Sequence, residues 1–520
     1  MIKKEQGKGS SEYNRMLDFP KDGAMGNSLS SDGDVSSYTY KELEQSLVDM
    51  RLSVSAALNT DNLNDRIKAV WSLAVSSSAV ISASLYAFNS DALPDRQGFW
   101  EIGCSFIDKL EEAMSKCIDS LPDEAPRLRL NLSREYLYLM RMKFLWYAAY
   151  YRAVPDKWWV NCFKAFGVIF TYHKSIDPEK LSGHHKLFLR EFIHTIVCSI
   201  CSFQSLNPAE IFIVNNVLAE VSADVKLSSE PLPFCRFFFN LDEPEKSVRP
   251  LSEKKPDEKV DFYLGLENIG ESIVTAFDVA EYPSILEVQK NRLINLLKIQ
   301  WGGYGESRRL HERHEAGFEA FGVFGYENIL GIIKTNPREY LSKLSADVLW
   351  KVTDMSASSF GVVIPDLRGS PIVIHTILAL ALPKAMSWRI CLVRRFKRTE
   401  NDSGFIGIEV LSAQPAVAFF EGKKGDSPIV KRNVFSFPDY DSLKDKLDAV
   451  NNVFLIPTDL TSKGFDCSLV SVMSGDCNQS FAKNEIEDVF SETTLIRCFS
   501  SDDGNSSTFP SGIDDWFLDS

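Results

Sequence analysis

The sequence predicts an α+β chain of several domains, in which an α-helical N-terminal domain precedes an antiparallel β-barrel and a second small β module. Three observations lead to this fold class. The chain has 520 residues, enough for two to four domains of about 100–200 residues each. Its apolar residues recur at helical spacing from about residue 40 to 227, and the pattern changes to short strands from about residue 301. Apolar residues make up 44% and charged residues 25% of the chain, which excludes wholesale disorder and a fibrous rod.

The N-terminal part is expected to be a disordered tail followed by helices. Residues 1–38 are rich in Gly, Ser, Asp and Lys and have few apolar side chains, which is typical of a tail. Residues 39–240 are expected to form the α-helical domain, because prolines punctuate its apolar segments at positions where helices end or begin. Seven helices are expected there, at 41–58, 62–88, 97–120, 131–153, 156–173, 179–204 and 208–223.

A charged stretch separates the helices from the strands. From Leu241 to Asp261, 12 of 21 residues are charged and three are proline, which favours a linker. With an apolar helix expected at 284–300, it makes a connecting region over 241–300.

Short strands then predict a barrel over 301–425, with a hairpin turn at Asn401–Gly404. The expected strands lie at 350–364, 371–382, 388–397, 404–411 and 416–420. Three more, at 453–457, 467–473 and 493–499, predict a C-terminal β module over 426–500. The aspartate-rich tail over 501–520 is expected to be disordered.

Charge and composition exclude some classes of function. The net charge of −14 argues against a partner that is a nucleic acid polymer, because proteins that coat DNA or RNA carry basic surfaces. The longest uncharged run, Ala69 to Ser90, contains seven serines and predicts a core helix, so no membrane span is expected. No apolar segment follows residues 1–8, so a secretory signal is not expected. The ten cysteines are dispersed without the regular spacing of a disulfide framework. Reduced thiols in a cytoplasmic protein are the simplest interpretation.

Two polar motifs could carry chemistry. Arg308, Arg309 and Arg313 follow a flexible glycine-rich segment at 302–305. Guanidinium groups match phosphate oxygens and the O6/N7 edge of guanine, although such a run alone more often forms a solvated basic turn. The second motif runs from Asp354 to Gly361 and leads into a strand, where an aspartate could accept from the N1–H and N2–H edge of guanine. Alone, it is equally typical of a polar turn between strands.

In this order, ahead of a small barrel, the two motifs resemble the PilZ domain, a bacterial receptor module for cyclic di-GMP. That family has RxxxR before its barrel and a D/N-x-S-x-x-G turn within it. Arg309 and Arg313 match the first pattern, and Asp354 and Ser356 match the start of the second. Ser359 stands where the family has glycine, and Gly361 lies two residues further on, as in a subgroup whose turn reads D-x-S-x-x-G-x-G.

The resemblance implies a PilZ-like barrel and a cytoplasmic bacterial receptor rather than an enzyme, with cyclic di-GMP as ligand and no other cofactor. The implied ligand contacts are Arg308, Arg309, Arg313, Asp354, Ser356, Ser359 and Gly361. Because the arginines precede the barrel, binding is expected to change the domain arrangement and so signal to a protein partner. The alternative is a degenerate PilZ-like protein that binds no nucleotide and acts as a helical protein-interaction scaffold. Ser359 in place of glycine favours this alternative.

Other residue patterns point to chemistry only weakly. His194, Cys198 and Cys201 are spaced i, i+4 and i+7 on an expected helix and could hold zinc with a fourth ligand. Apolar neighbours on the same helix favour ordinary core packing instead. The nucleophile-elbow, metalloprotease and phosphate-loop motifs are absent from the sequence, and its carboxylates are scattered. The sequence therefore predicts neither catalytic residues nor a metal site.

Overall fold

The chain divides into two compact units, which are described separately. A computed structural model describes residues 39–88, 93, 95–122, 124–171, 181–255, 257–279, 287–302, 312–344, 348–367, 372–385, 387–399, 401–423, 430–437, 452–457, 466–474, 477–489 and 493–500. The helical unit consists of residues up to Phe203, Pro208–Tyr282 and Gln300–Gly303. The barrel unit consists of Gln204–Asn207, Pro283–Ile299 and the chain from Tyr304 onward. The expected tails at 1–38 and 501–520 lie outside the described residues.

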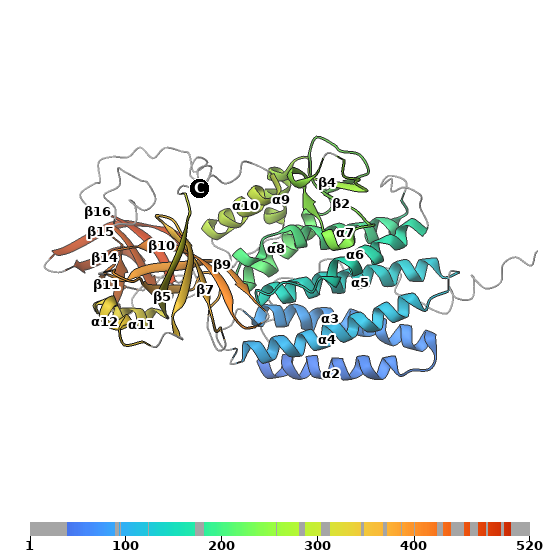
Figure 1. Cartoon of the computed structure of the whole chain (residues 1–520), viewed down its shortest axis with the longest axis horizontal. Coiled ribbons are helices and arrows are strands. Elements are labelled where there is room, and N and C mark those ends of the chain that lie inside the picture. Colours follow the sequence, from blue (N-terminus) through green and yellow to red (C-terminus); the bar gives the residue numbers. More distant parts are fainter. Residues whose placement is uncertain are drawn as a thin grey trace, which may run out of the picture. The chain divides into compact units, whose positions relative to one another are not determined.

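The seven expected helices are present in the helical unit, and α2, α3, α4 and α5 lie alongside one another (Figure 1). An eighth helix, α9 (Ile269–Val279), was not expected. The seven are α2 (Tyr40–Leu58), α3 (Leu63–Ala87), α4 (Arg96–Asp119), α5 (Pro126–Ala149), α6 (Lys157–Gly167), α7 (Gly183–Ile200) and α8 (Pro208–Val221).

Local sequence signals explain where these helices begin. Thr39 and Glu42 form a reciprocal capping box at the start of α2, and the Asp95 carboxylate accepts from the Gly98 amide at the start of α4. Pro126 occupies the first turn of α5, where its missing N–H costs nothing. This places the start of α5 five residues earlier than expected.

The charged segment 241–261 is more than a linker: it contributes to a small antiparallel sheet. Strands β1 (Lys226–Ser228), β2 (Cys235–Phe239), β3 (Arg249–Pro250) and β4 (Phe262–Gly265) pair in the order β1-β4-β2-β3. Arg249 forms an ion pair with Glu258 and lies over the Phe238 ring, 4.6 Å from its centroid. Because its charges are paired in this way, the segment can be ordered. Its composition alone predicted a linker.

Aromatic packing joins this sheet to the helices. The ring of Phe166 on α6 stacks on Phe192 of α7, with centroids 3.7 Å apart. Phe166 also meets Phe239 of β2 and Phe262 of β4 at 6.4 and 5.8 Å. All these rings are buried, so the sheet shares its core with α6 and α7.

One described helix has the length and composition to cross a membrane. Within α3, Leu63–Leu85 has a mean hydropathy of 1.3, and 44% of its most apolar window is buried in the protein. Core helices of soluble proteins have the same properties, and α3 contacts α2, α4, α5 and α8.

The barrel unit contains the expected antiparallel barrel as a closed, six-stranded one. The barrel is ordered β10-β7-β6-β5-β8-β9, and all its neighbouring strands run antiparallel. The expected strand at 350–364 is two strands separated by a turn, and β5 was not expected. The strands are β5 (His314–Phe324), β6 (Trp350–Met355), β7 (Ser359–Ile364), β8 (Ile377–Ala381), β9 (Arg389–Arg398) and β10 (Gly404–Ser412).

The C-terminal β module is a second closed barrel, with the order β11-β12-β13-β16-β15-β14. The strand at 416–420, expected in the first barrel, is β11 and pairs with β12 and β14 of the second. Apolar alternation identifies a strand but not its pairing partners, so position 425 was the wrong place to divide the barrels. The strands are β11 (Ala416–Lys423), β12 (Val430–Ser436), β13 (Asn452–Pro457), β14 (Asp466–Ser474), β15 (Cys477–Val489) and β16 (Thr493–Ser500).

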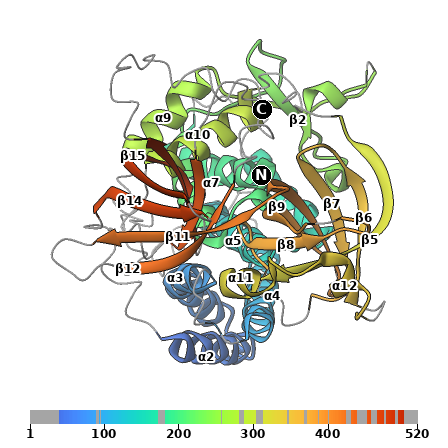
Figure 2. The same ribbon diagram turned by 90° about the vertical axis from the view of Figure 1, so that its left-hand side faces the viewer.

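The two barrels share a core through the short helix α11 (Tyr326–Ile332), which lies between them in Figure 2. The Tyr326 hydroxyl lies 3.2 Å from both the Asn433 and Leu455 carbonyl oxygens. Its ring meets Phe435 edge to face at 5.0 Å. A second short helix, α12 (Pro337–Leu341), and the long α10 (Glu287–Gly302) complete the described helices.

Candidate functional site

Strand register brings the two sequence motifs together. Arg313 immediately precedes β5, whose first residues His314 and Glu315 pair with Met355 and Asp354 at the end of β6. Two residues that are 41 apart in the chain therefore lie side by side on neighbouring strands. The turn between β6 and β7 follows at once, so its serines lie beside the same arginine.

The side chains of this cluster are hydrogen-bonded to one another. Arg313 Nη1 donates to Asp354 Oδ1 at 2.7 Å, and Arg313 Nη2 donates to Ser359 Oγ at 3.4 Å. The Ser356 and Ser359 hydroxyls are 2.7 Å apart, and the Ser356 amide donates to the Ser359 carbonyl at 2.8 Å. The side chains of Arg313 and Asp354 are each 26% exposed, so a ligand could reach both. We call Arg313, Asp354, Ser356 and Ser359 the turn cluster.

Gly361 makes room for the Asp354 carboxylate. A Cβ atom at position 361 would lie 2.1 Å from Asp354 Oδ2 and 2.8 Å from its Cγ. The carboxylate therefore lies directly against the β7 backbone. The Thr353 hydroxyl donates to the Gly361 carbonyl at 3.2 Å and lies 3.4 Å from Asp354 Oδ2. The glycine fixes the carboxylate by allowing close approach, not by adopting an unusual backbone angle.

Five of the seven expected site residues are thus brought together: Arg313, Asp354, Ser356, Ser359 and Gly361. Arg308 and Arg309 lie outside the described residues. Ser359, which departs from the glycine of the family pattern, does not have a positive φ. The backbone therefore does not need glycine there, and the hydroxyl adds hydrogen bonds to the turn cluster.

Sequence reasoning missed four further polar side chains near the turn. Thr353 was not singled out, because one threonine in a strand gives no signal. Arg394 Nε donates to Glu409 at 2.6 Å, and Glu409 pairs in register with Ser359. Arg389 lies over the ring of Phe360, 5.4 Å from its centroid. The basic residues gathered in the second half of 389–398 (Arg394, Arg395, Lys397 and Arg398) were the available signal for a basic strand.

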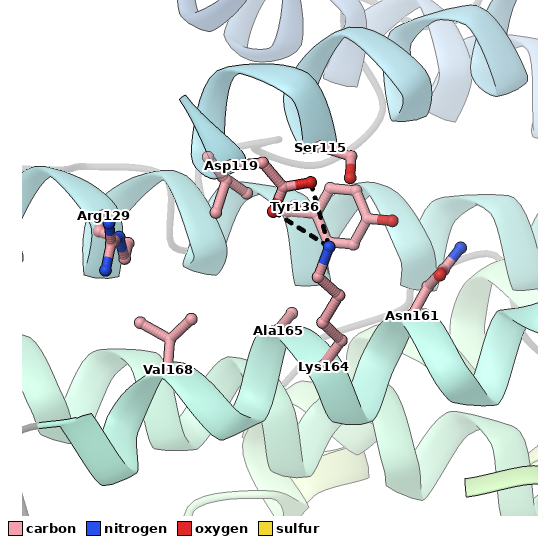
Figure 3. A pocket seen from close by; sticks show the side chains of 9 residues that line it. Ser115, Asp119, Arg129, Tyr136, Asn161, Lys164, Ala165 and Val168 are labelled. Atoms are coloured by element: carbon pink, nitrogen blue, oxygen red, sulfur yellow. Dashed lines mark hydrogen bonds and ion pairs between the residues drawn. The ribbon is translucent and has the colours of Figure 1, made fainter. Parts of the chain in front are cut away.

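The helical unit contains a pocket of about 280 Å³. Figure 3 shows Lys164 reaching from α6 across to Asp119 on α4, with Nζ 3.0 and 3.1 Å from the carboxylate oxygens. The polar groups of two other lining residues, Tyr136 and Asn161, donate to the partly buried Glu111 carboxylate. The lining residues are Ser115, Ile118, Asp119, Arg129, Tyr136, Asn161, Lys164, Ala165 and Val168.

The network beneath this pocket is internally paired. Lys143 donates to Glu111 at 2.6 Å and forms an ion pair with Asp108 at 2.7 Å. Burial acts to lower the pKa of Lys143, but the two carboxylates outweigh it and raise the pKa. Burial raises the pKa of Tyr136, which keeps its hydroxyl protonated. Because these groups bond one another, the network primarily holds α4, α5 and α6 together.

The expected zinc-ligand candidates form hydrogen bonds within the core. His194 Nε2 lies 3.0 Å from the Asn215 carbonyl oxygen, and Cys198 Sγ lies 3.7 Å from Asn215 Oδ1. Burial raises the pKa of Cys201 to about 12, which opposes the thiolate that a metal requires. Among the described residues, no group of three His, Cys, Asp or Glu side chains could hold a metal ion.

Comparison with known proteins adds no relative. No protein-family model matches this sequence, and neither the curated proteins nor the solved structures contain a match.

Proposed function

We propose that this chain is a receptor for cyclic di-GMP and binds it at the turn cluster. One observation carries the proposal: Arg313, Asp354, Ser356 and Ser359 come together where β5 begins and β6 turns into β7, although they come from two motifs far apart in the sequence. The PilZ-like pattern noted in the sequence supports the same assignment. Such a receptor would act in the bacterial cytoplasm and needs no catalytic group.

Each member of the turn cluster has a chemical role in this proposal. The Asp354 carboxylate accepts from the N1–H and N2–H edge of one guanine, and the serine hydroxyls add hydrogen bonds to it. Arg313 is held by Asp354 in a position to donate its other N–H groups to a phosphate or to the guanine O6/N7 edge. Arg308 and Arg309 would supply the remaining positive charge for a ligand that carries two phosphates.

We further propose that binding changes the arrangement of the two units. In sequence, Arg308 and Arg309 lie just after α10, at the passage from the helical unit to the barrel. A ligand held both by these arginines and by Asp354 would favour one arrangement over others, and a protein partner would detect the difference. Small-angle scattering of the full chain with and without ligand would measure this change directly.

Calorimetric titration of the full chain tests the proposal. Cyclic di-GMP should bind saturably, whereas GTP and cyclic GMP should not. Arg309→Ala and Arg313→Ala should each weaken binding at least about tenfold, because each removes a charge-assisted contact. Arg236→Ala, an exposed arginine on β2 of the helical unit, is the matched control.

The rival function is the nucleotide-free scaffold. If the wild-type chain shows neither binding heat nor a thermal shift with cyclic di-GMP, the receptor proposal is wrong. The helical unit would then be the place to search for a protein partner. Ser359 no longer favours this rival strongly, because its hydroxyl belongs to the turn cluster and its backbone does not require glycine.

A further inference from the structure

A row of residues crosses the outer surface of the first barrel through the turn cluster. Register pairs Glu315 of β5 with Asp354 of β6, Asp354 with Gly361 of β7, Gly361 with Gly407 of β10, and Gly407 with Arg395 of β9. Paired residues on neighbouring strands share a face of the sheet. Glu315 and Arg395 are exposed, so this face is the outer one. We call these five residues the cross-strand row.

The middle of the cross-strand row has no side chains of its own. Gly361 is covered by the Asp354 carboxylate from one side. A Cβ on Gly407 would lie 3.3, 3.7 and 3.8 Å from Cβ, Cγ and Cδ of Arg395, so the arginine chain lies against Gly407 from the other side. An acid and a base therefore approach from opposite ends across two adjacent glycines.

The row is also polarised in charge. Glu315 and Asp354 lie at the β5–β6 end, and the exposed Arg395 lies at the β9 end. Arg395 thus places an exposed guanidinium at the end of the row away from the two carboxylates.

We propose that Arg395 is a phosphate-binding residue of this site and that the ligand lies across Gly361 and Gly407. This inference rests on the proposed function. The N–H edge of a guanine faces Asp354, and a phosphate of the same nucleotide meets the Arg395 guanidinium. From β6 to β9 there are three strand spacings, about 14 Å along the sheet. Because the Asp354 side chain lies against Gly361 and the Arg395 side chain against Gly407, the distance left between the carboxylate and the guanidinium is shorter, and one nucleotide can span it.

Titration of the full-length protein with cyclic di-GMP tests this placement. Arg395→Gln should weaken binding by about tenfold or more, since it removes one charge-assisted contact. Gly407→Val should weaken it similarly without removing a charge, because the new side chain displaces the arginine. The backbone allows this substitution, as Gly407 lies in β10 and does not have a positive φ. The control is Lys397→Gln, two residues along the same strand and also exposed, which should bind within about twofold of wild type.

The salt dependence separates a phosphate contact from a structural effect. Raising the salt concentration should bring the Kd values of wild type and Arg395→Gln for cyclic di-GMP closer together, because salt screens the arginine–phosphate attraction that only the wild type has. If Arg395→Gln binds as tightly as wild type, this inference is wrong and the receptor proposal stands. Equal weakening by Lys397→Gln would also overturn it, because the effect would then be one of general charge. If the wild type does not bind, the receptor proposal fails and this inference fails with it.

Discussion

Replacing Gly361 with alanine probes the turn cluster by adding a single methyl group. The new Cβ would lie 2.1 Å from Asp354 Oδ2, closer than carbon and oxygen approach in proteins, and 3.1 Å from Oδ1. The β7 backbone does not resist the change, since only Gly325 among the described glycines has a positive φ. The carboxylate, not the strand, must therefore move.

The size of that movement determines the effect. Ordinary contact begins near 3.4 Å, so Oδ2 must retreat by about 1.3 Å. A shift of this size breaks the 2.7 Å bond from Arg313 Nη1 to Asp354. Because both side chains are 26% exposed, losing the pair should cost about 1 kcal/mol of folding free energy or less. Losing the carboxylate as acceptor for guanine should cost about 1.5–3 kcal/mol of binding free energy, roughly 10- to 150-fold in Kd.

Calorimetric titration with cyclic di-GMP, together with thermal unfolding, separates the two effects. Gly317→Ala is the matched control, because it lies on β5 of the same barrel and its Cβ would meet nothing within 4 Å. We expect Gly361→Ala to unfold near the wild-type temperature and to bind much more weakly. A folded Gly361→Ala protein with wild-type affinity would show that Asp354 does not contact the ligand in the position described here.

Three other properties of the chain can be measured without a ligand. Gly103→Ala should destabilise the helical unit by about 1–3 kcal/mol in denaturant unfolding, because its Cβ would lie 1.9 Å from the buried Trp146 ring. The control Gly167→Ala should not destabilise it, because a Cβ at Gly167 would meet nothing within 4 Å. Burial raises the thiol pKa values, that of Cys391 to about 12, so at most three of the ten cysteines should react with a thiol reagent at pH 8 before unfolding, since seven are buried. Burial and the nearby Arg292 guanidinium lower the pKa of His375 well below 6.5, so its unfolded form takes up the proton more readily. His375 alone should therefore lower the stability by up to about 1.4 kcal/mol per pH unit as the pH drops below 6.5, and His375→Asn should show a smaller fall between pH 7.5 and 5.5.

The helices were predictable because their signals are local. Apolar residues follow one another at four- and three-residue steps on α2, at Leu43, Leu47, Met50 and Val54, and all of these except Met50 are buried. The capping box at Thr39 marks the start of the helix. The hairpin at 401–404 likewise joins β9 to β10, with Asp402 at a φ of +54°. In each case the residues that determine the conformation lie within a few positions of one another.

The missed strands depended on contacts that are distant in sequence. β5 contains Gly322, which suggests a loop in a single sequence, but a Cβ there would lie 1.8 Å from the Trp350 ring on the neighbouring strand. The glycine therefore makes room for a partner 28 positions away. The apolar residues of β15 are irregularly spaced among polar and charged ones, so its pairing with β14 and β16 left no local signal.

The candidate site was predictable as a set of residue types but not as a geometry. The residue types of the arginines and of the Asp-x-Ser turn identified them as candidates in the sequence. That Arg313 contacts this turn depends on the β5–β6 register, which the sequence does not show. Arg395 could not be recognised in the sequence, because nothing local shows that it lies against Gly407. The same register that assembles the turn cluster also creates the cross-strand row.

The turn cluster is connected to the second barrel by a short path, which bears on how a bound ligand could be sensed. The Ser358 carbonyl, between Ser356 and Ser359, accepts a hydrogen bond from the Val410 amide at 2.8 Å. The next residue, Leu411, is 1% exposed and belongs to the core that both barrels share with Phe435. A ligand that orders the turn should therefore slow hydrogen exchange of the Val410 amide and of the strand around Phe435. If exchange slows at the turn but not around Phe435, the second barrel does not respond to the ligand.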